Sequence, residues 1–434
     1  MLETIGIEHF GQLFTAIPSE IRNPPIELPP ALSELEAQSW FRELSSKNTN
    51  VKDHLSFLGA GAYEHFIPSI VRHMIGRGEF YTSYTPYQPE ASQGTLQALF
   101  EYQSLICELT GMDVSNGSHY DGSTALAESI LMTLHETKRR KVLVARSVHP
   151  DYRQVAKTYL TGTQFEAQEV PFGKHFELDL ERLKKQLTPD VASVVIASPN
   201  FFGLLEDLKE VEALVHQNGS LFIMVAHPLS FGFYKTPKEW GADIVCGEGQ
   251  PLGIPLNLGG PWLGYIATTR SLMRRIPGRL VGLTQDTNGK RAFCLTLQAR
   301  EQHIRRERAS SNICTNQALC AIAACVYLAS LGKVGVRRIA ELNLENAYYL
   351  RTAISSFKEL KVLTQGAIFN EFVIQLPKSI EQANQLLLQK GIIGGLALER
   401  FFPELKNQML LCVTETKSKD DLDQLIQALK EVLK

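Results

Sequence analysis

The sequence lacks an excess of charge of either sign. Its 434 residues carry 44 Lys and Arg against 46 Asp and Glu, which gives a formal net charge of -2. Nucleic acids and anionic membrane surfaces attract proteins with a strong basic excess. The balance therefore predicts that neither nucleic acid nor a membrane is the main partner. The basic run at 300–308 is diluted by Glu301 and Glu307, which favours a solvated helix face.

Cysteines, signal-like segments and long apolar runs are also scarce. The seven cysteines are scattered without a Cys-x-x-Cys pair, which predicts reduced thiols in a cytoplasmic protein and neither a disulfide framework nor a metal site. The opening stretch contains Glu3 and Glu8, so it lacks the unbroken apolar core of a signal peptide. No run approaches the roughly 20 apolar residues that cross a bilayer, and we expect no membrane segment.

What the chain does have is enough length and apolar content, 44% hydrophobic residues, for more than one packed core. Closely spaced prolines in "IRNPPIELPP" interrupt helical segments near the start. We therefore predict an N-terminal arm or helical extension over 1–55, of the kind that wraps a neighbour. A large α/β domain is predicted over 56–330, and a small C-terminal α+β domain over 331–434.

Short apolar runs alternate with helical stretches through the predicted large domain. These runs are "KVLVA" at 141–145, "VASVVIA" at 191–197, "LFIMVA" at 221–226 and "ADIVC" at 242–246. The pattern predicts a mainly parallel sheet covered by helices on both faces. The stretch 312–330 is apolar nearly all round, which predicts a buried helix that links the two domains.

Polar residues that follow these strands are the candidates for a site, because ligands of parallel sheets bind at the carboxyl ends of the strands. Gly122, Ser123 and Thr124 stand at the start of a predicted helix and could cradle an anion such as phosphate; an ordinary helix N-cap is the alternative. His149 follows the strand at 141–145. It could stack on a planar ring or be an ordinary polar loop residue.

Two further positions matter for comparison with pyridoxal-phosphate enzymes of the aspartate-aminotransferase fold. In those enzymes an Asp at the end of one strand pairs with the pyridinium nitrogen, and a Lys after the next strand forms the Schiff base. The corresponding places here hold Val225 and Gln250. A valine cannot pair with a pyridinium and an amide cannot form an imine, so both functions are missing together.

The resemblance becomes specific over several long motifs. The chain resembles the P-protein family of the glycine cleavage system, glycine dehydrogenase (decarboxylating), in its subunit 1 form, from residue 1 to about 430. The segments that carry this resemblance are "IGIEHFGQLFTAIPSEIR", "FLGAGAYEHFIPSIVRHMIGRGEFYTSYTPYQPEASQGTLQALFEYQ", "YDGSTALAES", "LNLGGPWLGY", "VGLTQDTNGKRAFCLTLQAREQHIRRERASSNICTNQAL" and "MLLCVTET".

This resemblance implies an aspartate-aminotransferase-like fold (type I PLP-dependent transferase) and an α2β2 assembly with subunit 2. It also implies that pyridoxal phosphate is bound by subunit 2 and not covalently by this chain. The family reaction converts glycine and the lipoyl arm of the H-protein into carbon dioxide and an aminomethyl-dihydrolipoyl arm. Alignment with the partner's cofactor turn puts Gln250 on the Schiff-base lysine position and Val225 on the aspartate position, with Gly259, Gly260 and Pro261 at the end of the turn.

A subunit without the lysine and the aspartate can contribute to that reaction only across an interface, since active sites of this fold lie between paired subunits. The proline-interrupted loop 81–94 is the first candidate for lining the partner's pocket, through Tyr84, Tyr87, Gln88 and Glu90. The second candidate is the segment 61–66. It offers Tyr63 and His65. The alternative is that these residues only pack the interface.

Two other readings stay open from the sequence. The chain could be an enzyme by itself, with Lys235 or Lys238 supplying the imine. It could also be a nucleotide- or sugar-phosphate-binding module that reuses the degenerate pocket, with Ser123 and Thr124 on the anion. Neither a complete G-x-G-x-x-G after a strand nor a G-x-x-x-x-G-K-[ST] motif is present.

Overall fold

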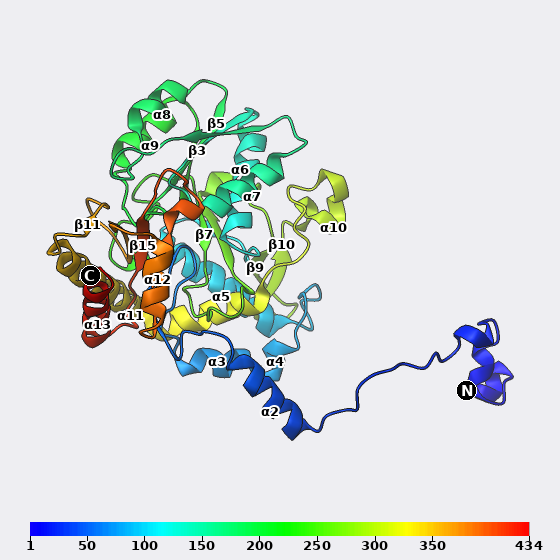
Figure 1. The fold of residues 1–434 in the computed structure, drawn as a ribbon. Coiled ribbons are helices and arrows are strands. Elements are labelled where there is room, and N and C mark those ends of the chain that lie inside the picture. Colours follow the sequence, from blue (N-terminus) through cyan, green and yellow to red (C-terminus); the bar gives the residue numbers. More distant parts are fainter. Residues whose placement is uncertain (434) are drawn as a thin grey trace. The chain divides into compact units, whose positions relative to one another are not determined.

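The structure, a computed structural model, describes residues 1–433 (Figure 1). These residues form two compact units, Met1–Asp53 and His54–Lys434.

The first unit is helical and contributes no residue to a buried core. It contains α1 (Leu2–Ile5), η1 (Phe10–Phe14), η2 (Ser19–Ile21) and α2 (Glu34–Ser45). Helix α2 starts where the prolines end, with the Ser33 hydroxyl accepting from the backbone N–H of Glu36 and the Glu36 carboxylate accepting from that of Ser33. Large apolar side chains of this unit remain exposed, among them Phe10 at 64% and Trp40 at 52%.

The second unit is built around a seven-stranded sheet in the order β2-β8-β7-β6-β5-β3-β4. Strands β4, β3, β5, β6 and β7 run parallel, whereas β8 is antiparallel to β7 and β2 antiparallel to β8. The bounds of the strands are β2 Val114–Ser115, β3 Lys141–Ala145, β4 Glu166–Val170, β5 Val191–Ala197, β6 Leu221–Val225, β7 Ile244–Glu248 and β8 Gly264–Thr268. The mainly parallel α/β sheet predicted from the sequence is therefore confirmed.

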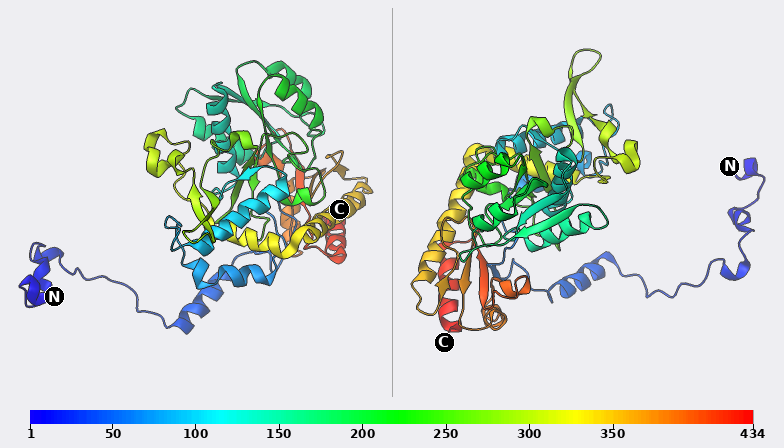
Figure 2. Two further views of the ribbon diagram at one scale, coloured as in Figure 1. Left: turned by 180° about the vertical axis from the view of Figure 1, so that it is seen from behind. Right: turned by 90° about the horizontal axis from the view of Figure 1, so that it is seen from above.

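Helices flank this sheet on both sides (Figure 2). Helix α6 packs against the central strands and against α7, while α9 packs against β6 and α8 against β4. The apolar side chains of the strands are almost all buried, which is typical of parallel strands covered on both faces. The helices are α5 Gln93–Thr110, α6 Gly122–Thr137, α7 Pro150–Leu160, α8 Leu180–Gln186 and α9 Lys209–Gln217.

A hairpin that the sequence reading did not predict follows β8. Strands β9 (Leu280–Gln285) and β10 (Arg291–Thr296) pair antiparallel over their full lengths. Between them, the Asp286 carboxylate accepts from the backbone N–H groups of Asn288 and Lys290 and so fixes the turn around Gly289. The hairpin leads into three short turns, η5 (Gln298–Arg300), α10 (Gln302–Arg305) and η6 (Arg306–Arg308).

Helix α11 (Ala318–Ser355) is longer than the buried helix predicted over 312–330. It contains one residue with non-helical backbone angles, Gly332 at φ 58° and ψ -175°. The predicted domain boundary at 330/331 falls inside this helix, and so the two predicted domains share it.

By length and composition α11 could cross a bilayer, so the prediction that no such run exists was wrong. Half of its most apolar window is buried inside this protein. The helix packs against α5, α3 (Ser69–Ile75) and η3 (Pro228–Gly232).

The C-terminal part has its own antiparallel sheet, in the order β11-β12-β15-β14. Helix α12 (Ile380–Leu388) and helix α13 (Lys419–Val432) pack on each other, and a separate apolar core lies beneath them. One short strand near the start of the second unit, β1 (Leu55–Ser56), pairs with β13 (Ile392–Ile393). The bounds are β11 Lys361–Val362, β12 Glu371–Gln375, β14 Leu396–Ala397 and β15 Gln408–Cys412.

Candidate functional site

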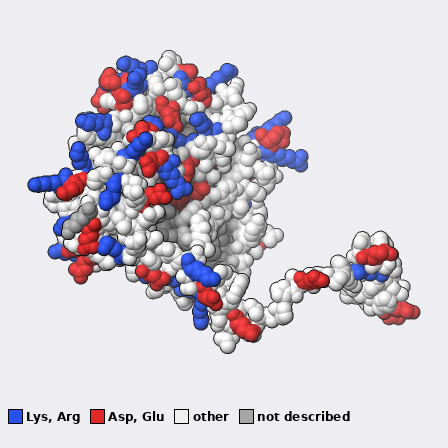
Figure 3. All heavy atoms as spheres, in the orientation of Figure 1, with Lys and Arg blue, Asp and Glu red and all other residues white. Residues whose placement is uncertain are grey.

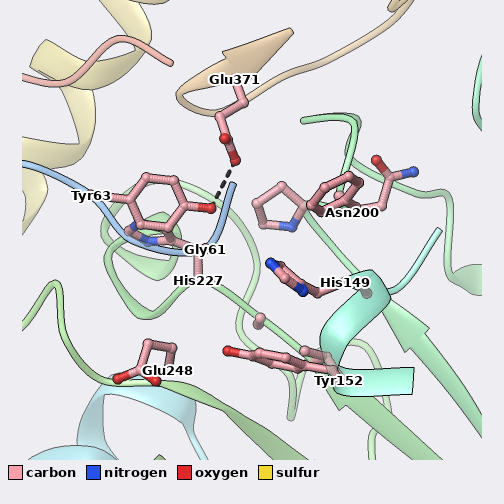
Figure 4. Close-up of a pocket in the computed structure, with 13 residues that line it drawn as sticks. Gly61, Tyr63, His149, Tyr152, Asn200, His227, Glu248 and Glu371 are labelled. Carbon is pink, nitrogen blue, oxygen red and sulfur yellow. Dashed lines mark hydrogen bonds between the residues drawn. The ribbon is translucent and has the colours of Figure 1, made fainter. Parts of the chain in front are cut away.

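A cavity of about 70 Å³ lies at the carboxyl edge of the parallel strands (Figure 4). Segments that follow β3, β5, β6 and β7 meet there with the loop at 60–63 and the first residue of β12. The residues that line the cavity are Gly61, Tyr63, His149, Tyr152, Ala197, Pro199, Asn200, Phe201, Val225, Ala226, His227, Glu248 and Glu371. The cavity therefore occupies the place in the fold where ligands of open α/β sheets bind.

Gln250 lies in the turn after β7, is only 1% exposed, and uses its whole amide group inside this chain. Its Oε1 accepts from the backbone N–H of Tyr63 at 2.9 Å. Its Nε2 donates to the carbonyl of Tyr63 at 2.9 Å and to that of Ile254 at 2.7 Å. Gln250 thus ties the turn to the loop at 60–63, and it is not among the residues that line the cavity.

The N-terminus of α6, where the sequence suggested an anion site, already holds two carboxylates of this chain. The backbone N–H of Gly122 donates to Glu248 at 3.0 Å. The hydroxyl groups of Ser123 and Thr124 donate to the Asp121 carboxylate at 2.8 and 2.9 Å, and the N–H of Thr124 does so at 2.7 Å. The expected donors are present, but they are occupied by Asp121 and Glu248.

Glu248 is held by two more backbone N–H groups, those of Gln250 at 2.9 Å and Leu263 at 3.0 Å. Burial raises the pKa of Glu248 to about 7, although these N–H donors favour its charged form. Space is also short at this helix end, because a Cβ on Gly122 would lie 2.1 Å from the Tyr152 hydroxyl oxygen.

His149 lies in the cavity wall, as the sequence suggested for a residue after β3. Its Nε2 bonds to the carbonyl of Ala60 at 2.8 Å, and its Nδ1 accepts from the N–H of Asp151 at 3.1 Å. Burial lowers its pKa, so the ring is neutral with the proton on Nε2. The rings of His149 and Tyr152 are 5.0 Å apart.

Tyr63, predicted as a candidate for the partner's pocket, lines this chain's own cavity, and His65 lies behind the wall, 5.6 Å from the ring of His227 between ring centroids. The Tyr63 hydroxyl donates to Glu371 at 2.8 Å, and burial raises the pKa of Glu371 to about 7. His65 Nδ1 pairs with Glu415 at 2.8 Å. Burial by itself raises the pKa of Glu415. The charge and the hydrogen bond of His65 outweigh this effect, so the pKa of Glu415 lies below its usual value.

The loop 81–94 presents its candidate residues to solvent instead. Tyr84 is 81% exposed, and Tyr87, Gln88 and Glu90 are exposed as well. None of the four lines the cavity. Tyr87 is held in place by Arg279, whose Nη2 donates to the tyrosine hydroxyl oxygen at 3.0 Å. The structure therefore separates this loop from the residues at 61–66.

Five residues with polar side chains in the cavity wall were not predicted from the sequence. Three directly follow or end a strand, which is the signal that could have found them: Asn200 after β5, His227 after β6 and Glu248 in β7. Tyr152 lies one turn into α7, and Glu371 is an acid that opens an apolar strand.

The lysines considered as imine donors lie elsewhere. Lys235 packs over the ring of Trp240, and Lys238 pairs with Asp113. Within residues 1–433, the cavity lining contains no lysine or arginine, and no group of three or more His, Cys, Asp or Glu side chains is arranged to hold a metal ion. The side chains of this pocket therefore do not fit a Schiff-base-bound pyridoxal phosphate.

Solved structures identify the fold. Sphingosine-1-phosphate lyase of Burkholderia pseudomallei superposes with a TM-score of 0.70 at 13% identity, covering 95% of this chain and 94% of that chain. A crystal structure of glycine decarboxylase (P-protein) of the glycine cleavage system, in inhibitor-bound form, gives a TM-score of 0.92 at 43% identity and covers 100% and 97%. The fold is thus the aspartate-aminotransferase-like fold of type I PLP-dependent transferases, as predicted.

Sequence comparisons identify the family. The family model described as "Glycine cleavage system P-protein" matches residues 1–429. A protein of Desulfitobacterium hafniense named "Probable glycine dehydrogenase (decarboxylating) subunit 1" is 50% identical, covering 100% of this chain and 97% of the relative. Its namesake in Anoxybacillus flavithermus is 51% identical, covering 99% and 96%. The chain belongs to the glycine cleavage system P-protein family.

Proposed function

We propose that this chain is subunit 1 of a two-subunit glycine dehydrogenase (decarboxylating), a cytoplasmic enzyme of the α2β2 type. In this proposal the partner, subunit 2, holds the pyridoxal phosphate, and the lipoyl H-protein is the second substrate. The reaction takes glycine and the oxidised lipoyl arm to carbon dioxide and the aminomethyl-dihydrolipoyl arm. Pyridoxal phosphate in the partner supplies the electron sink that decarboxylation needs.

The observation that carries the proposal is the environment of Gln250. The position that aligns with the Schiff-base lysine is buried and hydrogen-bonded on all its polar atoms to the loop at 60–63 and to Ile254. The neighbouring N-terminus of α6 is filled by Glu248. Such a pocket supports a role in which the chain completes an active site held by another subunit.

A surface suited to that partner adjoins the loop 81–94. On the face of the second unit shown in Figure 3, the half around α5, α6 and α7 is nearly free of charged side chains, while the other half carries both signs. Protein interfaces are depleted in charged residues at their core and enriched in tyrosine and arginine. Tyr84, and Tyr87 held by Arg279, fit that description. We propose that this loop lines the pocket of subunit 2.

The proposal is tested with the purified full-length chain, alone and after addition of subunit 2. Pyridoxal phosphate is added, absorbance in the imine band is recorded before and after borohydride reduction, and glycine-bicarbonate exchange is measured. We expect no imine band, no covalent label and no exchange from the chain alone, and exchange once subunit 2 is present. A borohydride-stable label on a lysine of this chain contradicts the proposal.

The role of the loop needs its own comparison. Tyr87→Phe removes only the hydroxyl that accepts from Arg279, while Tyr349→Phe on the far helix α11 removes a hydroxyl that donates to Asp423 at the surface. In the reconstituted complex we expect the first variant to reduce exchange at least several-fold and the second to leave it unchanged. Equal activity of the two variants would contradict a role of Tyr87 in the partner's pocket.

A further inference from the structure

The cavity at the carboxyl edge of the sheet has acidic walls without a neutralising cation. Glu248 and Glu371 both line it, and its lining contains neither lysine nor arginine within residues 1–433. The hydrogen bonds to both carboxyl groups come from neutral donors: three backbone N–H groups on Glu248, and the Ala60 N–H and Tyr63 O–H on Glu371. These donors form hydrogen bonds with the carboxyl oxygens, but because they are neutral they do not balance the negative charge of a carboxylate.

Burial makes that arrangement costly for the charged forms. It raises the pKa of both Glu248 and Glu371 to about 7. A buried carboxylate is stabilised by a cation at short range far more strongly than an exposed one, because water screens it less. A positively charged ligand in this cavity therefore gains from two groups that this chain leaves uncompensated. An anion meets the same two groups as repulsion.

A second, independent feature is the ring of His227, which is only 9% exposed and lines the cavity. Neither Nδ1 nor Nε2 of this ring has a hydrogen-bond partner. Burial, together with the nearby His65, lowers its pKa well below the usual range, so the ring is neutral and one nitrogen carries a free lone pair. Buried polar groups in native proteins are nearly always paired, so this unpaired ring is an unusual feature of the cavity wall.

The remaining walls are aromatic. Tyr63 lies 4.7 Å from His227 between ring centroids, and His149 lies 5.0 Å from both Tyr152 and Phe201. Figure 4 shows Glu371 and Glu248 on opposite sides, with the rings of Tyr63, His149 and Tyr152 between them. Aromatic faces attract organic cations. The volume of about 70 Å³ admits a ligand of only a few heavy atoms, since one water takes roughly 10–15 Å³ of such space.

We propose that this cavity binds a small primary ammonium ion such as methylammonium. Its N–H groups donate to the Glu371 carboxylate, and its alkyl group packs among the aromatic rings of the wall. The inference is independent of the function proposed above, because it concerns the cavity of this chain and not the cofactor site of a partner. It also predicts that glycine, whose carboxylate finds no cation here, binds poorly.

The test is thermal unfolding of the full-length chain at pH 8 and constant ionic strength. Methylammonium chloride is titrated against sodium chloride, with tetramethylammonium chloride, glycine, inorganic phosphate and pyridoxal phosphate as comparisons. We expect methylammonium to raise the midpoint saturably, by roughly 2 °C or more once the site is filled. The other four compounds should have no saturable effect. Tetramethylammonium is too large and has no N–H donor, and glycine, phosphate and pyridoxal phosphate all carry negative charge.

Two variants locate the effect. Glu371→Gln keeps the shape of the side chain but removes the charge: its amide oxygen can still accept from the Ala60 N–H, and its NH2 group can donate to the Tyr63 hydroxyl. The exposed Glu399→Gln is its matched control. Val225→Lys places an ammonium group in the cavity from a wall position. Glu371→Gln and Val225→Lys should lose the response to methylammonium, and Glu399→Gln should keep it.

Three results overturn the proposal: no saturable rise with methylammonium, an equal rise with phosphate or pyridoxal phosphate, or an undiminished response in Glu371→Gln. Should Glu371→Gln fail to fold, calorimetric titration of wild type and Val225→Lys with methylammonium decides the question.

Discussion

At the scale of single residues, two side chains next to the cavity, Gln250 and Glu248, satisfy backbone groups through ordinary hydrogen bonds. Gln250 makes three bonds to backbone groups that no other side chain satisfies. The Glu248 carboxylate accepts from three backbone N–H groups, those of Gly122 at the N-terminus of α6, Gln250 in the turn after β7, and Leu263. Because leaving a buried polar group unpaired costs more than the net gain of making the bond, both residues stabilise the fold.

The first prediction concerns Gln250→Ala. The substitution leaves the N–H and the carbonyl of Tyr63 and the carbonyl of Ile254 without partners in a buried place, so we expect a loss of about 2–4 kcal/mol in the free energy of unfolding. Urea denaturation measures it. The exposed Gln424→Ala in α13 is the control and should change stability by less than about 0.5 kcal/mol. Equal effects of the two would show that the Gln250 bonds do not stabilise the fold.

The second prediction concerns pH and Glu371. The folded pKa of about 7 lies above the ordinary value of 4.5, so between these two values the folded chain holds a proton that the unfolded chain has released. Stability from this group therefore falls as pH rises from 4.5 to 7 and is constant outside that window. Relative to Glu371→Gln, the wild type should lose about 3 kcal/mol across it. Denaturation of both proteins from pH 4.5 to 8.5 measures the difference; a pH-independent difference would contradict the raised pKa.

At the scale of elements, the sequence predicted those strands and helices whose position depends on a local pattern of apolar residues. The strands expected at 141–145 and 191–197 have those bounds, and α6 begins at Gly122, where a helix start was expected. It missed β4 at the sheet edge, because three of its five residues, Glu166, Gln168 and Glu169, are polar. It also missed the hairpin β9–β10 despite the Asn-Gly at its turn. Long-range partners were also invisible: Glu371 is 308 positions from Tyr63, yet the two side chains meet in the cavity.

The third prediction concerns the interruption of α11. Gly332 has φ 58° and ψ -175°, a region of backbone space open almost only to glycine. A Cβ there meets no atom within 4 Å, so the cost of Gly332→Ala is backbone strain alone, about 1–3 kcal/mol. Gly94→Ala is a matched control in α5, because it also faces open space but has helical geometry and should be neutral or stabilising. Thermal unfolding compares the two.

At the scale of the whole molecule, the first unit stands out for its exposed apolar side chains. It buries no residue of its own, yet it carries a series of large hydrophobic groups, among them Phe10, Trp40 and Phe41. Exposed apolar surface on that scale marks a site of protein-protein association. The arm predicted from the prolines at 21–30 therefore fits a role in assembly.

The fourth prediction is the deletion of residues 1–53. Because these residues form a separate compact unit with no buried residue of its own, we expect the unfolding midpoint of the remainder to stay within about 2 °C. We expect its association with subunit 2, followed by analytical ultracentrifugation, to weaken at least tenfold. A truncated chain that assembles like the full-length chain would rule out a role of the arm in assembly.

The bonds around Gln250 and Glu248 also constrain evolutionary reversal. A change of Gln250 to lysine discards three hydrogen bonds, and the new lysine finds a valine at 225 and the N-terminus of α6 already occupied by the Glu248 carboxylate. Positions 225, 248 and 250 would have to change together before a bound cofactor could repay the lost stability. Each single substitution costs hydrogen bonds without gaining a cofactor, so under the proposed function the division of labour between the two subunits would be hard to reverse.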